Sequence, residues 1–274
     1  MTLSGATPNY ASRLELLFQL ADLARKVTLP RFLTQVEATS KSDHYFDPVT
    51  PADRECEYVL REHIHKAFRD DGIHGEEFEA TIGSSGWNWS IDPIDGTRGY
   101  IAGVPVWSTL IGLSYHASPM LGLMDFPALD KRYFGTPSKS WVEGANATHE
   151  PLQVKPCMGL KEAILGCTEP LAMFSAEELR TYQSIREKVR FSRLGLDAYG
   201  YALIAEGRMD IIVEARLKPC DVSAIIPVIK NAGGHISTWS GGSAQDGGNI
   251  IACGDMRVLS DASSLLHAEL KAAE

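Results

Sequence analysis

The segment 89–97 constrains this chain more than any other, because an apolar, strand-like run ends there in two carboxylates three positions apart. Pro93 fixes the backbone between Asp92 and Asp95, and a glycine and a threonine follow at once. Clustered carboxylates are costly in a folded protein unless a cation neutralises them or one of them takes up a proton. Hard oxygen ligands around a tight turn suit Mg²⁺, which completes its coordination with water and substrate phosphate. The segment therefore predicts a magnesium-dependent enzyme that acts on a phosphate.

The composition is that of a globular, acidic protein. Of the 274 residues, 44% are hydrophobic and 22% are charged, which excludes a disordered chain. A formal net charge of −9 argues against a nucleic-acid partner, but not against a small phosphorylated substrate beside a bound cation. The five cysteines are scattered and form no CxxC pair, as in a reducing compartment. No secretory signal and no apolar run of the ~18 residues that a membrane span needs are visible, so we expect a cytoplasmic protein with no membrane partner.

Hydrophobic spacing predicts two helices and then a change to strands. Leucines and alanines recur at helical spacing between residues 14 and 24. A second helix starts after Thr50, a good N-cap, with Pro51 at the first helical position and Asp53 three residues beyond the cap. The region 36–49 between them is polar and rich in turn residues. Strands are then expected at 87–91, 109–115, 120–126 and 132–136.

The second half alternates strands with helices, so two layered sub-domains are expected. Residues 1–147 are predicted to form an α+β sub-domain with most of the site residues, and residues 148–274 an α/β sub-domain. The polar stretch 143–150 is the best boundary. The elements expected in the second half are strands at 163–166, 209–214, 236–238 and 249–252, and helices at 175–189, 198–206, 221–231 and 262–272.

Four acidic positions stand out in this arrangement, and each has an ordinary explanation when it is taken alone. Asp53 and Asp221 lie where a helix would begin, a position that capping and the helix dipole favour for aspartate. Glu76 follows a glycine and fits a solvated turn, and Asp92 with Asp95 fits a simple turn. An EF-hand is excluded because this segment lacks the required alternation of oxygen ligands.

Taken together, these positions resemble the inositol monophosphatase superfamily. The resemblance extends from about residue 41 to residue 234, and its Asp-Pro-Ile-Asp-Gly-Thr element is highly specific. It implies a layered sandwich like that of fructose-1,6-bisphosphatase, in which α and β layers alternate. The matching elements are Pro48-Val49-Thr50-Pro51-Ala52-Asp53, Gly75-Glu76-Glu77, Asp92-Pro93-Ile94-Asp95-Gly96-Thr97, and Lys218-Pro219-Cys220-Asp221 ahead of a helix that ends at a Gly-Gly pair.

Carried over by position, this resemblance assigns roles to the site residues. It implies a small phosphorylated substrate and Mg²⁺ as the cofactor, with two or three ions per site. Backbone N–H groups of Gly96 and Thr97, at the start of a short helix, would hold the phosphate. Thr97 and Asp53 would form the pair that orients the attacking water, along with Glu76. The implied metal ligands are Glu76, Asp92, the carbonyl of Ile94, Asp95 and Asp221.

Features that select the substrate lie in the second half. The run 192–201 departs from the Gly-Ser/Thr-Ala-Ala pattern of inositol-specific members and looks like the Arg-x-Gly-x-Asp-x-Tyr-x-Tyr run of the histidinol-phosphatase branch. Histidinol phosphate carries an ammonium and a protonatable imidazole, and both need carboxylate partners. Asp197 and Glu214 are the acids available outside the implied metal set. Arg193 would pair with Asp197 or approach the phosphate, and a plain surface salt bridge between Arg193 and Asp197 is the alternative.

These features predict a Mg²⁺-dependent histidinol-phosphate phosphatase of histidine biosynthesis that works by attack of a metal-activated water. The alternative on the same scaffold is an inositol-1-phosphate phosphatase, or a broad sugar-phosphate or nucleotide 3′-phosphatase. A third hypothesis, a catalytically silent phosphate-binding protein, is disfavoured by the intact carboxylates and Thr97. Because relatives pair as homodimers, a homodimer is expected.

Overall fold

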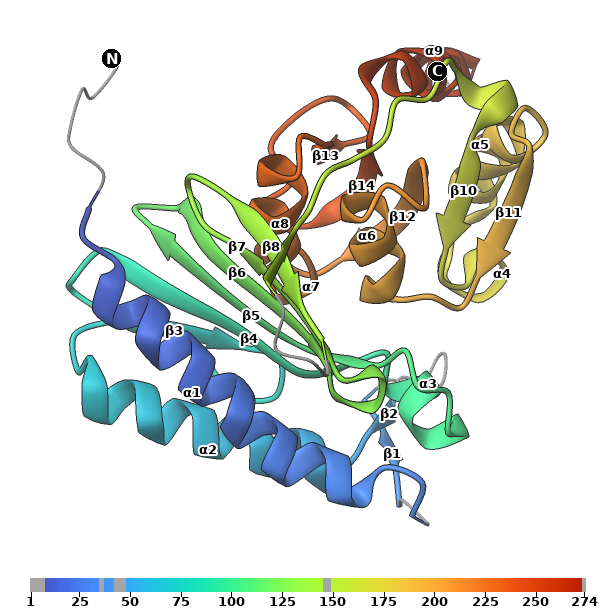
Figure 1. Ribbon diagram of the computed structural model, residues 1–274. Helices are drawn as coiled ribbons and strands as arrows, with labels where there is room; N and C mark the ends of the chain where they lie inside the picture. Colours follow the sequence, from blue (N-terminus) through green and yellow to red (C-terminus); the bar gives the residue numbers. More distant parts are fainter. Residues whose placement is uncertain (1–7, 35–36, 42–47, 145–148, 273–274) are drawn as a thin grey trace.

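The structure is a computed structural model that describes residues 8–34, 37–41, 48–144 and 149–272, and it opens with two helices (Figure 1). Helix α1 (Ala11–Thr28) runs into the 3₁₀ turn η1 (Leu29–Arg31), and α2 (Pro51–Ala67) packs against α1. The predicted start of α2 is confirmed, because the Thr50 side chain accepts from the backbone of Ala52 and Asp53 accepts from the backbone of Thr50. Between the helices, β1 (Thr39–Ser40) pairs with β2 (Pro48–Val49), where only turns were expected.

The larger sheet has seven strands, which lie across it in the order in which they occur in the chain. The first two strands are parallel and the others are antiparallel. The four strands predicted here are confirmed, whereas the first and the last two, which are short, were not predicted. The strands are β3 (Gly72–Gly75), β4 (Trp87–Asp95), β5 (Ser108–Tyr115), β6 (Ser118–Phe126), β7 (Lys131–Gly135), β8 (Ser140–Glu143) and β9 (His149–Pro151). The segments that connect the strands of this sheet include α3 (Thr97–Ala102), between β4 and β5, and the 3₁₀ turn η2 (Pro127–Leu129), between β6 and β7.

The smaller sheet has five mixed strands in the order β11-β10-β12-β14-β13. The predicted strands are present, and β11, an exposed edge strand, was not predicted. The strands are β10 (Ile164–Cys167), β11 (Phe191–Leu194), β12 (Ile211–Leu217), β13 (His235–Thr238) and β14 (Gly248–Cys253). The helices are η3 (Leu160–Glu162), α4 (Pro170–Met173), α5 (Ala176–Arg186), α6 (Ala198–Ala205), α7 (Pro219–Ser223), α8 (Ile225–Asn231) and α9 (Met256–Ala272).

Helices and sheets alternate through the molecule, which confirms the predicted layered sandwich (Figure 1). Helices α1 and α2 cover one face of the seven-stranded sheet, and α6, α7 and α8 fill the space between the two sheets. Helix α9 packs on the far face of the five-stranded sheet with α5 beside it. Each layer boundary has its own apolar core, as burial of one face of every sheet and helix requires.

The single helix predicted over 221–231 is two helices, and Pro227 explains the interruption. A proline lacks the N–H that would bond to the carbonyl four residues earlier, and its ring clashes with that carbonyl. Here that residue is Ser223, where α7 ends. The α7–α8 junction lies so close to β6 that a Cβ on Gly122 would overlap the carbonyl oxygen of Ala224. This close approach brings Asp221, on α7, toward β4.

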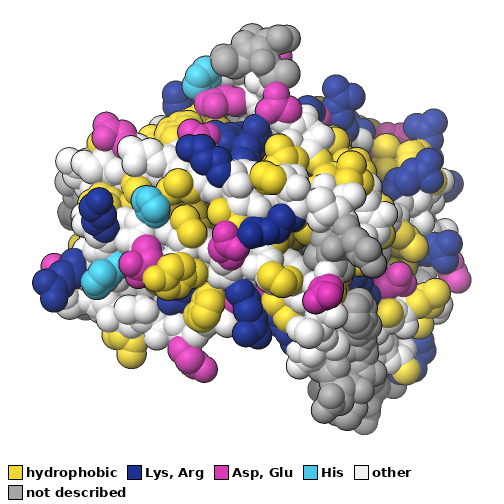
Figure 2. All heavy atoms as spheres, turned by 90° about the horizontal axis from the view of Figure 1, so that it is seen from below, with side chains coloured by type: hydrophobic (Ala, Val, Ile, Leu, Met, Phe, Trp, Pro, Cys, Tyr) yellow, Lys and Arg dark blue, Asp and Glu magenta, His cyan; other side chains and the backbone are white. Residues whose placement is uncertain are grey.

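The predicted boundary between residues 147 and 148 lies outside the described residues, and the seven-stranded sheet continues just beyond it in β9. The division into two sub-domains therefore stays a prediction. No helix in the described ranges is long and apolar enough to cross a membrane. On the face shown in Figure 2, acidic and basic side chains are interspersed, and hydrophobic side chains occur in small separate groups.

Candidate active site

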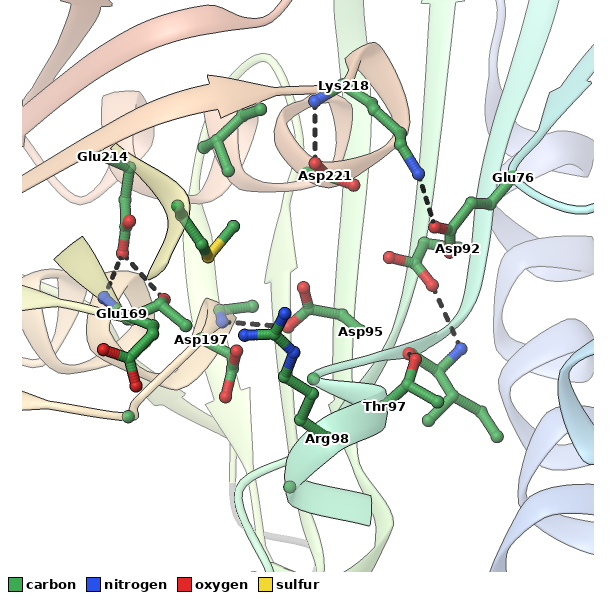
Figure 3. Close-up of a pocket in the computed structure, with 18 of the residues that line it drawn as sticks. Glu76, Asp92, Asp95, Thr97, Arg98, Glu169, Asp197, Glu214, Lys218 and Asp221 are labelled. Atoms are coloured by element: carbon green, nitrogen blue, oxygen red, sulfur yellow. Dashed lines mark hydrogen bonds and ion pairs between the residues drawn. The ribbon is translucent and has the colours of Figure 1, made fainter. Parts of the chain in front are cut away.

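A pocket of about 390 Å³ lies between the two sheets and gathers most of the predicted site residues (Figure 3). Two predicted residues, Asp53 and Arg193, do not line it. The predicted residues that line it are Glu76, Asp92, Ile94, Asp95, Gly96, Thr97, Asp197, Glu214 and Asp221. We call the two ends of the pocket the β4 end, formed by Glu76, Asp92, Asp95 and Asp221, and the β10 end, formed by Thr168, Glu169, Asp197 and Glu214.

A β-bulge in β4 brings the two aspartates of the central motif to the same side of the strand. Asp92 lies opposite Leu110 and Asp95 opposite Ser108, so three steps along β4 match two steps along β5. Side chains three positions apart on a regular strand point to opposite faces, and one extra residue corrects this. Asp92 Oδ1 also accepts a hydrogen bond from the Ile94 N–H at 3.1 Å, which holds the turn. The motif therefore presents both carboxylates to one pocket.

Glu76 is placed by a buried carboxylate that the sequence did not point to. Glu57 on α2 is fully buried, and its Oε2 accepts from the backbone N–H of Glu77 at 2.7 Å. Its Oε1 accepts from the N–H of Phe78 at 3.3 Å and from Arg61 Nε at 2.7 Å. Glu57 therefore fixes the turn that follows β3, and with it the direction of the Glu76 side chain.

Lys218 connects Glu76 to Asp221. Its ammonium donates to Glu76 Oε1 at 2.9 Å, and its backbone N–H donates to Asp221 Oδ2 at 2.7 Å. Lys41 also contacts Glu76 Oε1, at 3.1 Å. Burial alone would raise the pKa of Glu76, but the attraction of Lys218 and Lys41 outweighs it and holds the pKa below the ordinary value. Glu76 is therefore ionised at neutral pH.

In the other three acids of the β4 end, burial and repulsion from neighbouring carboxylates destabilise the charged form of each side chain. Burial raises the pKa of Asp92 well above its ordinary value, and repulsion from Glu76 raises it further. Burial does the same for Asp95, with added repulsion from Asp197. Burial raises the pKa of Asp221 to about 6 despite the Lys218 N–H. A cation bound at this end would relieve all three.

The donor set at this end fits Mg²⁺ better than it fits a metal held only by protein. Among the described residues, no three Asp, Glu, His or Cys side chains are arranged to hold an ion by themselves. Mg²⁺ keeps several waters and needs only one or two carboxylates together with substrate phosphate. The carboxylates and the Ile94 carbonyl are hard oxygen donors. The nearby Cys220 thiol is a soft donor, and it donates to Asp221 Oδ1 at 3.5 Å.

The short helix α3 begins directly after the bulge. Gly96 has a φ of +78°, and a Cβ there would lie 3.1 Å from the carboxyl group of Asp197, so glycine fits this position. Thr97, the first residue of α3, donates its hydroxyl hydrogen to the Ile94 carbonyl at 2.9 Å. Gly96, Thr97 and the Ile94 carbonyl, to which the resemblance gives roles in phosphate and metal binding, thus lie together in one turn of the chain.

The structure places Asp53 behind the pocket wall. It is fully buried, and its Oδ2 accepts from both the hydroxyl and the N–H of Thr50, at 2.5 and 2.9 Å. The second oxygen, Oδ1, has no partner among the described residues, and burial raises the pKa of Asp53 to about 6. The predicted pairing of Asp53 with Thr97 is not formed here, because each makes its hydrogen bonds within its own turn. Its catalytic role stays a prediction, while its capping role is confirmed.

At the β10 end, Glu214 projects from β12 and is held by the loop after β10. Its Oε1 accepts from the N–H of Thr168 at 2.7 Å and from the Thr168 hydroxyl at 2.8 Å. The Cys167 thiol donates to its other oxygen at 3.6 Å. Burial raises the pKa of Glu214 to about 7, although the Thr168 bonds oppose this. Glu214 is therefore a fixed acceptor that gains from a nearby positive charge.

Asp197 belongs to the β10 end and lies next to the bulge of β4, since a Cβ on Gly96 would be 3.1 Å from its carboxyl group. It precedes α6 with a φ of +46°, and burial raises its pKa to about 6 while Arg98 opposes the shift. The next residue, Ala198, donates its N–H to Asp95 Oδ2 at 2.9 Å. This bond joins the start of α6 to the bulge of β4, so the two ends of the pocket are held at a set distance.

The predicted partner of Asp197 is corrected by the structure. Arg193 lies on the exposed edge strand β11, where its guanidinium is 5.5 Å from the centre of the Phe191 ring. The guanidinium that acts on Asp197 is that of Arg98, on α3. Arg193 is exposed and does not line the pocket, and the described residues show no salt bridge between it and Asp197. Its predicted contact with the phosphate stays a prediction.

Several residues of the pocket were missed by the sequence prediction. Arg98 directly follows the central motif, and Lys218 belongs to the quoted Lys-Pro-Cys-Asp element. The position of each in or beside a motif is therefore a signal that could have identified it. Glu169 follows strand β10, and residues after parallel strands commonly face ligands, which is a usable signal. Tyr201 is the last residue of the Arg-x-Gly-x-Asp-x-Tyr-x-Tyr run, but no role was predicted for it because it lies within a buried apolar helix.

Comparison with known proteins agrees with this geometry. The sequence profile of the inositol monophosphatase family matches residues 9–273. The chain is 34% identical to a histidinol-phosphatase of Chlorobaculum parvum over 87% of this chain and 91% of the relative. It is 35% identical to a chloroplastic bifunctional phosphatase of Arabidopsis thaliana over 86% of this chain and 69% of the relative.

A solved structure extends this agreement to the fold. An inositol monophosphatase from Zymomonas mobilis superposes with a TM-score of 0.84 at 32% identity, covering 95% of this chain and all of the other. The profile match spans nearly the whole chain, and the layered fold agrees with it. The chain therefore belongs to the inositol monophosphatase family, a family of phosphatases.

Proposed function

We propose that this chain is a Mg²⁺-dependent phosphatase that converts histidinol phosphate and water into histidinol and phosphate. One observation carries the proposal: a single pocket has an acidic β4 end that suits cations and phosphate, and a second acidic end that suits a cationic organic group. The similarity to a histidinol-phosphatase of Chlorobaculum parvum supports the choice of substrate.

At the β4 end, the chain's own oxygen atoms would hold the metal ions. Glu76, Asp92, Asp95 and Asp221 would supply carboxylate ligands, and Ile94 its carbonyl. When bound, Mg²⁺ would neutralise phosphate oxygens, lower the pKa of a bound water and stabilise the leaving alkoxide. Positioning and charge neutralisation would supply most of the rate enhancement.

The remaining residues of this end would position the reactants. Glu76 stays ionised beside its lysines, so it can accept a hydrogen bond from the attacking water, and the Thr97 hydroxyl lies one turn away on α3. The backbone N–H groups of Gly96 and Thr97 would hold a phosphate oxygen. Asp53 would act on this arrangement from behind, through the turn that begins α2.

At the β10 end, Asp197 and Glu214 would bind the organic part of the substrate. Burial raises the pKa values of both carboxyl groups, so each is stabilised by a cationic partner. Histidinol carries an ammonium and an imidazole, which supply such partners. Inositol supplies only hydroxyl groups, and sugar phosphates and nucleotides bring further hydroxyls or negative charge. The acidic β10 end therefore favours histidinol phosphate.

The substrate is tested by measuring phosphate release from histidinol phosphate and from inositol 1-phosphate in parallel. We expect kcat/KM to be larger for histidinol phosphate by at least about tenfold, since one charge-assisted contact provides that much. A preference for the inositol ester would instead support the second candidate, an inositol-1-phosphate phosphatase, to which the similarity to the Zymomonas mobilis enzyme points. Rescue of a histidine auxotroph that lacks histidinol phosphatase, with Asp95→Asn as the inactive control, tests the same proposal in cells.

We also propose that the protein acts in the cytoplasm as a homodimer. The five cysteines are all buried and free, as expected in a reducing compartment. The dimer is an expectation from the family resemblance, and light scattering after size-exclusion chromatography tests it. A molar mass close to the 30.0 kDa of one chain would contradict it.

A further inference from the structure

Glu169 lines the pocket, but the proposed mechanism assigns it no role. It lies in the loop after β10 and is half-buried. Although it precedes α4, its side chain makes no helix-cap hydrogen bond. Within the described part of the chain, no hydrogen bond or ion pair occupies its carboxylate. Figure 3 shows this carboxylate on the same side of the pocket as Asp197 and Glu214.

The charges at this end do not balance. Among the described residues at this end, three carboxylates, those of Glu169, Asp197 and Glu214, face the guanidinium of Arg98, which acts on Asp197. Arg216 also lines the pocket, but its guanidinium is 3.1 Å from Glu178. An excess of negative charge beside low-dielectric walls attracts a cationic ligand.

The three carboxylates differ in what remains free to bind. One oxygen of Glu214 already accepts two hydrogen bonds from Thr168, so that side chain is a fixed acceptor. Asp197 is neutralised in part by Arg98. Within the described ranges, Glu169 has neither a fixed set of donors nor a cation. A primary ammonium, with three rotatable N–H donors, suits such a flexible carboxylate.

A second and independent observation shows that this end is short of a hydrogen-bond partner. Tyr201 on α6 lines the pocket and is only 2% exposed. Its hydroxyl has no hydrogen-bond partner among the described residues. Buried hydroxyl groups without partners are rare, and a bound ligand is one of the ordinary ways in which they are satisfied.

We propose that Glu169 is a specificity residue that binds the primary ammonium of an amino-alcohol phosphate, with the Tyr201 hydroxyl completing the contacts of the same organic group. This inference rests on the proposed function and extends it. It divides the task at the β10 end, because Glu214 then serves the imidazole and Glu169 the ammonium. Esters without an amine gain nothing from Glu169.

The test compares Glu169→Gln with the wild-type protein on two esters. One is histidinol phosphate, and the other is its analogue without the amine, 3-(imidazol-4-yl)propyl phosphate. For Glu169→Gln we expect kcat/KM to fall about 10- to 100-fold with histidinol phosphate and less than about twofold with the analogue. The matched control is Glu177→Gln, an exposed position on α5 outside the pocket, which should leave both values unchanged.

The outcomes separate this inference from the proposed function. If the wild-type protein prefers inositol 1-phosphate to histidinol phosphate, the proposed function fails. A second outcome is that the wild-type protein prefers histidinol phosphate while Glu169→Gln lowers kcat/KM equally for both esters, or for neither. In that case only the role of Glu169 is overturned. Tyr201→Phe provides the second variant, with an expected severalfold rise in KM for histidinol phosphate. A higher melting temperature with unchanged KM would show that the Tyr201 hydroxyl has no part in binding.

Discussion

At the scale of single residues, the β4 end is a set of buried acids held together by few cations. Among the described residues, Glu76 contacts two lysines, whereas Asp221 accepts hydrogen bonds from a backbone N–H and the Cys220 thiol. Asp95 accepts from the Ala198 N–H and, at 3.3 Å, from Ser108 Oγ. Groups with raised pKa values in a pocket are typical of functional sites, where a ligand supplies the missing charge.

The raised pKa of Asp221 predicts how the stability of the metal-free protein depends on pH. Its carboxyl titrates at 3.8 ordinarily and at about 6 in the fold, so the folded state binds more protons between these values. The charged form is therefore the destabilising one, and the penalty grows as pH rises from about 4 to 6. In EDTA, Asp221→Asn should melt above the wild-type protein at pH 7, and the difference should vanish near pH 4. Equal melting curves for Asp221→Asn and the wild-type protein at pH 7 would show that the charged Asp221 carboxylate does not destabilise the fold.

Asp95 provides the sharpest separation of activity from stability. With saturating Mg²⁺, Asp95→Asn should lower kcat/KM by about a thousandfold, since a metal ligand worth several kcal/mol is lost. Without metal, the variant should melt no lower than the wild-type protein, because the asparagine oxygen can still accept from Ala198 while the buried charge is gone. Asp246→Asn, at an exposed loop position, is the control. Activity within tenfold of the wild type would show that Asp95 is not a ligand.

At the scale of elements, the site depends on three local interruptions of regular structure. The bulge in β4 aligns Asp92 with Asp95, the turn after β3 aims Glu76, and the break at Pro227 separates α7 from α8. Each carries a sequence signal, namely proline or glycine. The signals mark where an element stops, but packing against neighbouring elements decides where each carboxylate then points.

A substitution at Gly122 on β6 tests whether packing of the α7–α8 junction on the sheet controls the position of Asp221. A Cβ there would overlap the Ala224 carbonyl oxygen, so Gly122→Ala must push the α7–α8 junction away from the sheet. We expect a loss of about 1–3 kcal/mol in the free energy of unfolding and weaker Mg²⁺ binding, because Asp221 moves with α7. Chemical denaturation and calorimetric titration with Mg²⁺ measure the two effects. Gly144→Ala, where a Cβ would find its nearest atom at 3.9 Å, should change neither.

At the scale of the whole molecule, the pocket joins the two sheets. Its β4 end belongs mainly to the seven-stranded sheet, whereas Asp221 and the β10 end come from the second half of the chain (Figures 1 and 3). Ligands at this junction contact both halves. Binding energy at the site therefore contributes to the stability of the complete fold.

Metal binding should accordingly be visible in both activity and melting. EDTA should abolish phosphate release, and Mg²⁺ should restore it, because the proposed reaction needs the bound cation. At a concentration about 100 times the dissociation constant, Mg²⁺ should stabilise the protein by about 2.7 kcal/mol, or raise its melting temperature by about 5–10 °C. Sodium chloride at equal ionic strength is the control. Phosphate release that persists in excess EDTA would contradict the proposed mechanism.

Local sequence signals were sufficient for much of the fold. Periodicity and capping residues located α1, α2, α5 and the long central strands, because those patterns depend on neighbours within a few positions. A four-residue strand carries little periodicity, so such strands are located unevenly: the patterns predict β10 and β13 but not β3, β8 or β11. The apolar pattern over 221–231 predicts one helix, whereas Pro227 divides this segment into α7 and α8.

The amino-acid sequence by itself determined the chemistry of the site: carboxylates around a Pro-Ile turn, a threonine after a glycine, and acids in the second half. Side-chain identity sets which ligands are available, and no fold is needed to count them. Only the tertiary structure decided which of them meet. It placed the charge of Arg98 where it acts on Asp197, left Arg193 on an exposed edge and Asp53 outside the pocket lining, and brought Glu169 and Tyr201 into the pocket. Such meetings depend on how distant layers pack, which short-range patterns do not encode.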